Sequence, residues 1–265
     1  MPEKKTGTCC ICGEDGELSY EHVPPEAAFN DQRIFQHSLQ DMMKAEEEGR
    51  KPKGKWVQRG AGRYSLCEPC NNATGVLYGK AYVSWARQAA ELLDRSGGQL
   101  SLAYPYALHP LRVIKQVAAM FCSVCGPTLQ KKFPELPKFI LDRDCRWLPH
   151  DLKVYAYLVD PNESTGGRTS PMAKRTEGRE HIFAELAFAP LGFVLTGDVV
   201  PVNVDLIDIT AFGQWPYHNW QTVYLKLPVL PIVSGLPGDF RTKDQLLKSE
   251  VSGERLGRID LDVLN

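Results

Sequence analysis

Two closely spaced cysteine pairs constrain the fold of this chain more than any other feature of its sequence. Cys9 and Cys12 form one C-x-x-C pair, Cys67 and Cys70 form another, and residues 13–66 lie between them. A two-residue gap lets both thiolates of a pair reach one ion, so two pairs supply the four ligands of a tetrahedral zinc site. We therefore expect one structural Zn²⁺ that joins two distant stretches of chain. Cys10 is too close to Cys12 to form a good pair, and we expect it to take no part.

The same spacing leaves one alternative open. A C-x-x-C pair at a helix start can be redox-active, so the two pairs could cycle between thiol and disulfide instead of holding metal. Cys122 and Cys125 also have this spacing, but they lie in an amphipathic stretch and are interpreted as small buried residues. Met1 to Lys5 are mostly polar and no apolar run approaches about 18 residues, so neither a signal peptide nor a membrane span is expected. We expect a cytoplasmic protein, whose reduced thiols favour metal binding.

Three polar residues that suit metal binding and proton transfer lie beside the cysteine pairs. Glu21 and His22 follow the first pair, and Asn71 directly follows Cys70. Glutamate and asparagine offer oxygen ligands, which suit Mg²⁺ or Mn²⁺ better than zinc. A histidine can accept a proton from water at neutral pH. Simpler interpretations remain: His22 could be satisfied by a backbone carbonyl, Asn71 could cap the helix expected from residue 73, and Asn72 could take the place of Asn71.

These residues resemble a known family. Glu21-His22-Val23-Pro24-Pro25 and Cys67-Glu68-Pro69-Cys70-Asn71-Asn72, framed by Cys9 and Cys12, are similar to the zinc-containing branch of the HNH, or ββα-metal, nucleases. The resemblance covers about residues 8–80 and implies a zinc-bound treble-clef module that hydrolyses phosphodiester bonds in DNA. It implies that Glu21 and Asn71 hold a catalytic Mg²⁺ or Mn²⁺ and that His22 is the general base.

The sequence departs from the family pattern at two points. The acidic position is Glu21, where aspartate is commoner, and the helix after Asn71 carries no third histidine, since the next one is His109. A non-catalytic zinc module that binds nucleic acid or protein is therefore the alternative function.

A basic stretch follows the acidic run 46–48. From Arg50 to Arg63 no residue is acidic, and the candidate nucleic-acid contacts in it are Lys51, Lys53, Lys55, Arg59 and Arg63. A solvated basic loop is the alternative interpretation. The formal net charge of −1 counts against a wide DNA-binding surface, because phosphate neutralisation supplies most non-specific affinity.

Apolar periodicity predicts helices first and strands second. We expect helices over 36–48, 73–95, 110–125 and 135–141, and strands over 17–23, 154–159, 181–189, 191–196, 206–209 and 222–227. The strands follow one another without the long helices of parallel crossovers, so the sheet should be mainly antiparallel and the fold α+β.

We expect two domains from this pattern. The nuclease-like module spans 1–100 with an inserted loop at about 26–66, and an α+β domain of unknown role spans 101–265. The second domain could dock the substrate or a protein partner or regulator. Its segment 160–180 is expected to be a polar loop whose basic residues contact phosphates: Arg168, Lys174, Arg175 and Arg179.

Overall fold

The computed structural model describes residues 5–164, 166–176, 179–197 and 205–252. The chain forms two compact units, each assembled from separate stretches. The first contains 1–88, 106–150 and 210–223, and the second contains 89–105, 151–209 and 224–265. Among the described residues, no helix has both the length and the apolar character needed to cross a membrane.

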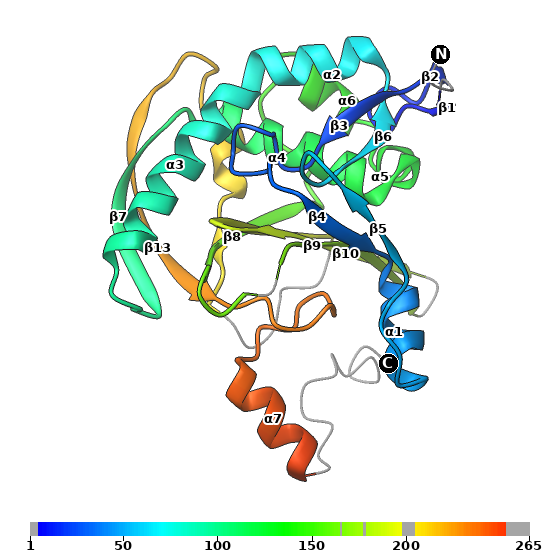
Figure 1. Ribbon diagram of the computed structural model, residues 1–265. Helices are drawn as coiled ribbons and strands as arrows, with labels where there is room; N and C mark the ends of the chain where they lie inside the picture. The colour runs from blue at the N-terminus through cyan, green and yellow to red at the C-terminus, as the bar shows by residue number, and fades with distance from the viewer. Residues whose placement is uncertain (1–4, 165, 177–178, 198–204, 253–265) are drawn as a thin grey trace. The chain divides into compact units, whose positions relative to one another are not determined.

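The first unit begins with three antiparallel strand pairs. Strand β1 (Thr6–Thr8) pairs with β2 (Asp15–Glu17), β3 (Ser19–His22) with β6 (Gly62–Leu66), and β4 (Ile34–His37) with β5 (Gly54–Val57). Helix α1 (Leu39–Glu47) connects β4 to β5, so this hairpin and its helix are inserted between β3 and β6. Figure 1 shows β4 and β5 leading away from β3 and β6 and carrying α1 at their end. The inserted segment is thus partly stranded, where the sequence predicted only a helix and a loop.

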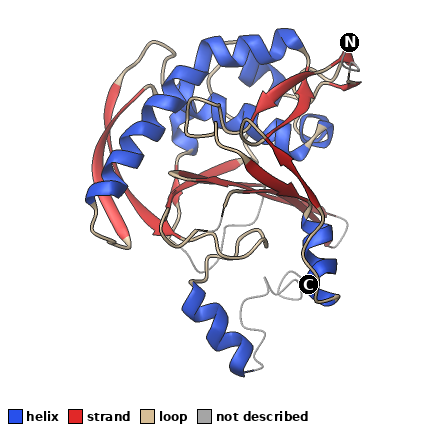
Figure 2. Ribbon diagram, viewed as in Figure 1, coloured by secondary structure: helices blue, strands red, loops and turns tan. Residues whose placement is uncertain are grey.

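A long helical segment follows β6 almost at once. Helix α2 (Glu68–Thr74), a π-helical turn (Gly75–Gly79) and α3 (Lys80–Arg95) succeed one another without a break (Figure 2). The helix begins five residues earlier than the sequence predicted, because Cys67 is extended at its N-cap and Pro69 suits the first turn. It ends before Gly97 and Gly98, as expected.

Three further helices complete the first unit. They are α4 (Pro110–Cys125), α5 (Pro127–Lys132) and α6 (Leu136–Leu141). Helix α4 has the predicted bounds and is buried over nearly its whole length. Large aromatic side chains fill the core of this unit: Tyr78, Tyr82, Trp85 and Phe121 are all almost completely inaccessible to solvent. A short 3₁₀ helix spans Thr210–Gln214.

A seven-stranded sheet dominates the rest of the chain. Its strands are β7 (Ser101–Leu108), β8 (Lys153–Val159), β9 (Arg168–Thr176), β10 (Arg179–Phe188), β11 (Leu191–Thr196), β12 (Ile207–Asp208) and β13 (Gln221–Leu230). The order is β7-β13-β8-β11-β10-β9, with β12 also paired to β8. The pairs of β8 to β12 are antiparallel, and β13 meets β8 in parallel. The mixed α+β class and the mainly antiparallel sheet are therefore confirmed. Helix α7 (Lys243–Ser252) was not predicted.

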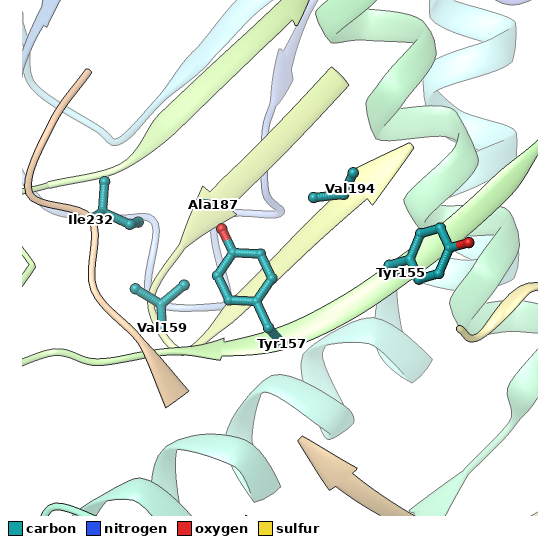
Figure 3. Packing of buried hydrophobic residues seen from close by; sticks show 6 residues of the cluster. All are labelled: Tyr155, Tyr157, Val159, Ala187, Val194 and Ile232. Atoms are coloured by element: carbon teal, nitrogen blue, oxygen red, sulfur yellow. The ribbon is translucent and has the colours of Figure 1, made fainter. Parts of the chain in front are cut away.

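Apolar side chains from neighbouring strands gather in the core of the second unit. Figure 3 shows Tyr157 and Val159 of β8 near Val194 of β11 and Ile232 of the segment after β13. The hydroxyl of Tyr157 donates to Oε1 of Glu185 over 2.5 Å, so the phenol is satisfied although it is buried. Such a core supplies the burial that holds the sheet together.

The predicted polar loop at 160–180 is wrong, because residues 168–176 form β9 and pair with β10. Arg168 is buried there and donates from Nη2 to Oε1 of Glu185 over 2.7 Å. Its Nη1 donates to the carbonyl oxygens of Ser234 and Asp239. Arg168 therefore compensates a buried carboxylate and is not available to phosphates. The side chains of Lys174, Arg175 and Arg179 lie outside the described residues.

Candidate metal and catalytic site

The four cysteines of the two pairs come together in the first unit. The Sγ atoms of Cys9, Cys12, Cys67 and Cys70 all lie within 4.8 Å of one another. Sulfur atoms bound tetrahedrally to zinc at about 2.3 Å would lie about 3.8 Å apart. The Sγ atoms of Cys12 and Cys67 are 3.8 Å apart. The spacing thus fits a metal ion such as zinc, and the predicted cysteine cluster is confirmed.

Backbone hydrogen bonds shape the first half of this cluster. The amide of Gly13 donates to the carbonyl oxygen of Cys9 over 3.0 Å, and the amide of Cys9 donates to that of Glu14 over 2.9 Å. This tight turn lies between β1 and β2. Burial raises the pKa of the neighbouring Cys10 thiol to about 11. Cys10 is not among the four cysteines whose Sγ atoms come together, as expected.

The second half of the cluster begins α2. The thiol of Cys70 lies against that of Cys9, and the hydrogen bond between them lowers the pKa of Cys9 and raises that of Cys70. The two thiols thus share one proton, as expected of sulfur atoms brought this close together. The amide of Asn71 donates to the carbonyl oxygen of Cys67 over 3.0 Å, so the turn that holds both cysteines is already helical. Asn71 is consequently inside α2, and the interpretation of this residue as a helix cap does not hold.

The side chain of Asn71 reaches back to β3. Its Nδ2 donates to Oγ of Ser19 over 3.0 Å and to the carbonyl oxygen of Tyr20 over 3.2 Å. A carbonyl can only accept, so the contact with Tyr20 assigns the amide nitrogen to this side and leaves Oδ1 facing away from it. An oxygen held in this way suits a hard divalent cation. Asn72, the alternative ligand, is exposed.

His22 is held by a backbone carbonyl. Its Nε2 lies 2.8 Å from the carbonyl oxygen of Arg59. Because that oxygen cannot donate, Nε2 carries a proton, and in the neutral ring Nδ1 is the nitrogen with the lone pair. The Tyr20 ring meets the imidazole edge to face, with centroids 5.1 Å apart. The carbonyl contact was the simpler interpretation of His22, yet it also orients the ring and leaves Nδ1 able to accept a proton.

Glu21 lies between these two aromatic residues on β3 and points to the opposite side. Successive side chains of a strand alternate, so the contact of Tyr20 with His22 places Glu21 on the other face. Glu21 is only 7% exposed. Its burial raises the pKa of the carboxyl group to about 7. A buried carboxyl group of this kind gains from a cation that would stabilise its charged form.

The loop that holds His22 is fixed by Asn30, a residue that the sequence did not single out. Asn30 is fully buried. Its Nδ2 donates to the carbonyl oxygens of Pro24 and Ala61, and its Oδ1 accepts from the amide of Ala61 over 2.6 Å. Gly60 has a φ of +71°, and a Cβ there would lie 1.8 Å from the carbonyl oxygen of Asn30. Asn30 and Gly60 together set the position of the Arg59 carbonyl.

The predicted basic residues have different surroundings. Lys51, Lys53 and Lys55 are exposed at or beside β5. Arg59 is also exposed, and it forms an ion pair with Glu26 at 2.8 Å. Arg63 turns inward, where Nη1 donates to the carbonyl oxygens of Ser123 and Val124 at the end of α4. This position suits a cation, because the last carbonyls of a helix carry partial negative charge. Arg63 is thus separated from the exposed lysines.

The described geometry joins the cysteine cluster, Asn71 and the strand that carries Glu21 and His22 into one part of the first unit. Cys67 and Cys70 fix the start of α2, Asn71 ties α2 to β3, and Asn30 fixes the loop that orients His22. No family model, curated protein or solved structure matches this chain.

Proposed function

We propose that this protein is a metal-dependent endonuclease of the HNH type that hydrolyses phosphodiester bonds in DNA. Four cysteines hold a structural Zn²⁺, and Glu21 with Asn71 provides oxygen ligands for Mg²⁺ or Mn²⁺. The observation that carries the proposal is the contact between Nε2 of His22 and the carbonyl oxygen of Arg59. A histidine with one nitrogen held by a carbonyl and the other free is prepared to act as a base.

The reaction requires a water molecule to attack phosphorus while a P–O bond breaks. His22 accepts a proton from that water at Nδ1, while Nε2 keeps its own proton and donates it in the hydrogen bond to the Arg59 carbonyl oxygen. The oxygen of water forms the new bond to phosphorus, and the leaving oxygen takes a proton from solvent. A divalent ion bound by Glu21 and Asn71 would neutralise charge on the phosphate and the leaving oxygen. Asn71 orients its Oδ1 through Ser19 and Tyr20.

A second candidate function follows from the opposite orientations of Glu21 and His22. Residues on opposite faces of β3 do not converge on one atom unless the strand twists or a ligand draws them together. The strand pair, α2 and the cysteine cluster would then form a zinc module that binds nucleic acid or protein without cleaving it. Such a module would need no second divalent ion.

A cleavage assay decides between these functions. Plasmid, branched and single-stranded DNA are incubated with the full-length zinc-loaded protein and with Mg²⁺ or Mn²⁺. His22→Ala is compared with wild type and with His218→Ala, which removes an exposed histidine outside the cysteine-rich part. Zinc content and circular dichroism are measured for all three proteins.

The nuclease proposal predicts metal-dependent cleavage that His22→Ala lowers by about 100-fold or more, in the range of general acid–base catalysis. His218→Ala should cleave like wild type. Equal cleavage by His22→Ala and wild type would overturn the role of His22. Binding of DNA with no cleavage of any substrate, and no effect of Mg²⁺ on any property, would establish the non-catalytic module.

A further inference from the structure

One face of the β4–β5 hairpin is both exposed and aromatic. Phe35 pairs with Trp56 and His37 pairs with Gly54, and paired residues of antiparallel strands share a face. Phe35 is 41% exposed and Trp56 is 56% exposed. An exposed hairpin face ordinarily carries polar side chains, so rings gathered on it mark a contact surface.

The two rings are held in fixed positions before any ligand arrives. The ring centroids of Phe35 and Trp56 are 5.4 Å apart, with an angle of 60° between the planes. The ring of Phe35 lies over Gly54, where a Cβ would be 2.7 Å from Cζ of that ring. The guanidinium carbon of Arg33 lies 4.2 Å from the centroid of Trp56. Rings that are already ordered lose little entropy when a flat ligand stacks on them.

The charge around these rings suits a polyanion. Neither β4 nor β5 contains an acidic residue. The exposed cations on or beside them are Arg33, Lys51, Lys53 and Lys55. Of the acidic residues on and after α1, Asp41 and Glu48 are both engaged by Arg50, at 2.9 Å and 2.5 Å. Lys55 pairs with Gln36 and lies on the face opposite the rings, whereas Arg33 lies over Trp56 on the face that carries them. Arg33 is therefore the cation best placed for a phosphate next to a stacked base.

We propose that Trp56 and Phe35 form a stacking site for an unpaired base, and that Arg33, whose guanidinium lies over Trp56, binds a flanking phosphate. The flat face of a base is accessible only when the base is unstacked, so the site selects single-stranded or splayed nucleotides over continuous duplex. This inference rests on the proposed function, since it names the substrate class of that nuclease. Both strands of the hairpin connect to the β3–β6 pair that bears Glu21 and His22, so nucleic acid bound at that pair can continue onto the hairpin (Figure 1).

Binding without cleavage tests this site separately from catalysis. A fluorescently labelled single strand and the blunt duplex of the same sequence are titrated with the full-length zinc-loaded protein, without Mg²⁺ or Mn²⁺. Trp56→Ala removes the ring and Trp56→Phe retains one. Trp220→Ala is the matched control, because Trp220 is 57% exposed and lies outside the hairpin.

The expected result is that Trp56→Ala weakens single-strand binding about tenfold and leaves duplex binding within about twofold of wild type. Trp56→Phe should retain most of the affinity and Trp220→Ala all of it. The inference is overturned if Trp56→Ala binds single strands like wild type, if both substrates lose affinity equally, or if wild type binds neither.

The two proposals fail in different ways. A protein that binds single strands through Trp56 but cuts no DNA would refute the nuclease and keep the stacking site. A protein that cuts DNA but binds it independently of Trp56 would refute the stacking site alone.

Discussion

The side-chain amide nitrogen Nδ2 of Asn71 donates a hydrogen bond to the carbonyl oxygen of Tyr20 over 3.2 Å. This contact ties helix α2 to strand β3 one residue before Glu21. The helix is in turn fixed at its first turn by Cys67 and Cys70 of the cysteine cluster. A structural metal would therefore determine where the candidate catalytic residues lie without taking part in their chemistry. Replacing Asn71 is therefore the most direct test of the connection between the cysteine cluster and strand β3.

Replacing Asn71 with alanine should raise the Mg²⁺ concentration needed for half-maximal cleavage by about 10- to 100-fold, because an oxygen ligand and its orienting contacts are both lost. Zinc content should not change, since no thiol is removed. The measurement is a Mg²⁺ titration of cleavage. Asn72→Ala is the control, because Asn72 is exposed on the same helix. A larger effect of Asn72→Ala would assign the metal ligand to that residue.

Replacing the buried Asn30 with alanine should lower the free energy of unfolding by about 3 kcal/mol, because the partners of its amide would stay buried and unpaired. The carbonyl oxygens of Pro24 and Ala61 and the amide of Ala61 are those partners. Urea unfolding measures the loss. Cleavage by the protein that remains folded should also fall, since the loop bearing the Arg59 carbonyl is released. Asn162→Ala serves as an exposed control, and equal urea midpoints for both variants would contradict the prediction.

Glu21 should make stability depend on pH when no divalent ion is present. Burial raises the pKa of its carboxyl group from 4.5 to about 7, so the folded protein prefers the protonated form. The protonated Glu21 carboxyl group therefore stabilises the folded protein fully below about pH 4.5, and this stabilisation is lost as the pH rises through about 7. Between pH 5 and 8 the free energy of unfolding should fall, relative to Glu21→Gln, by an amount on the order of 3 kcal/mol.

The comparison with Glu21→Gln cancels the other groups that titrate in this range. Adding Mg²⁺ at pH 8 should restore stability to wild type and leave the glutamine variant unchanged, because only the carboxylate gains from the cation. Parallel pH profiles for the two proteins would show that Glu21 is solvated or already compensated.

Removal of one cysteine should unfold the cysteine-rich part of the first unit. Cys67→Ser should lose bound zinc and the near-ultraviolet signal of the surrounding aromatic residues, since structural zinc contributes directly to folding. Cys10→Ala should keep one zinc per chain, because Cys10 is not one of the four clustered cysteines. A Cys67→Ser protein with full zinc content and a native spectrum would contradict the assignment. One zinc per wild-type chain would also exclude cycling between thiol and disulfide at these pairs.

The elements with strong local signals were predictable. Helix α4 has a regular apolar face and begins at a proline, and its predicted bounds are those observed. Strands β8 and β11 are short apolar runs whose side chains are buried on both faces of the sheet. Their predicted bounds agree with the observed ones to within one residue. The cysteine cluster was predictable because the C-x-x-C spacing itself encodes the geometry of a metal site.

The parts that depend on distant partners were not predictable. Strand β9 is rich in polar residues, and the burial of Arg168 in it is explained by Glu185 of the next strand and by the carbonyl oxygens of Ser234 and Asp239. Asn30 has partners up to 31 residues away along the chain. Arg63 was grouped with the lysines by charge, but the end of α4 supplies its partners. In each case tertiary structure, and not local composition, decides the role of the residue.

The chain between β3 and β6 contains parts that differ in their tolerance of changes in length. Residues 23–61 leave and return at neighbouring strands that are already paired, and the cost of closing such a loop grows only slowly with its length. Changes of length are therefore tolerated best within the β4–β5 hairpin and α1, while Asn30, Gly60 and the β3–β6 pair tolerate almost none. Under the proposed function, exchanging the hairpin would change which nucleic acid the protein binds and leave the surroundings of His22 in place.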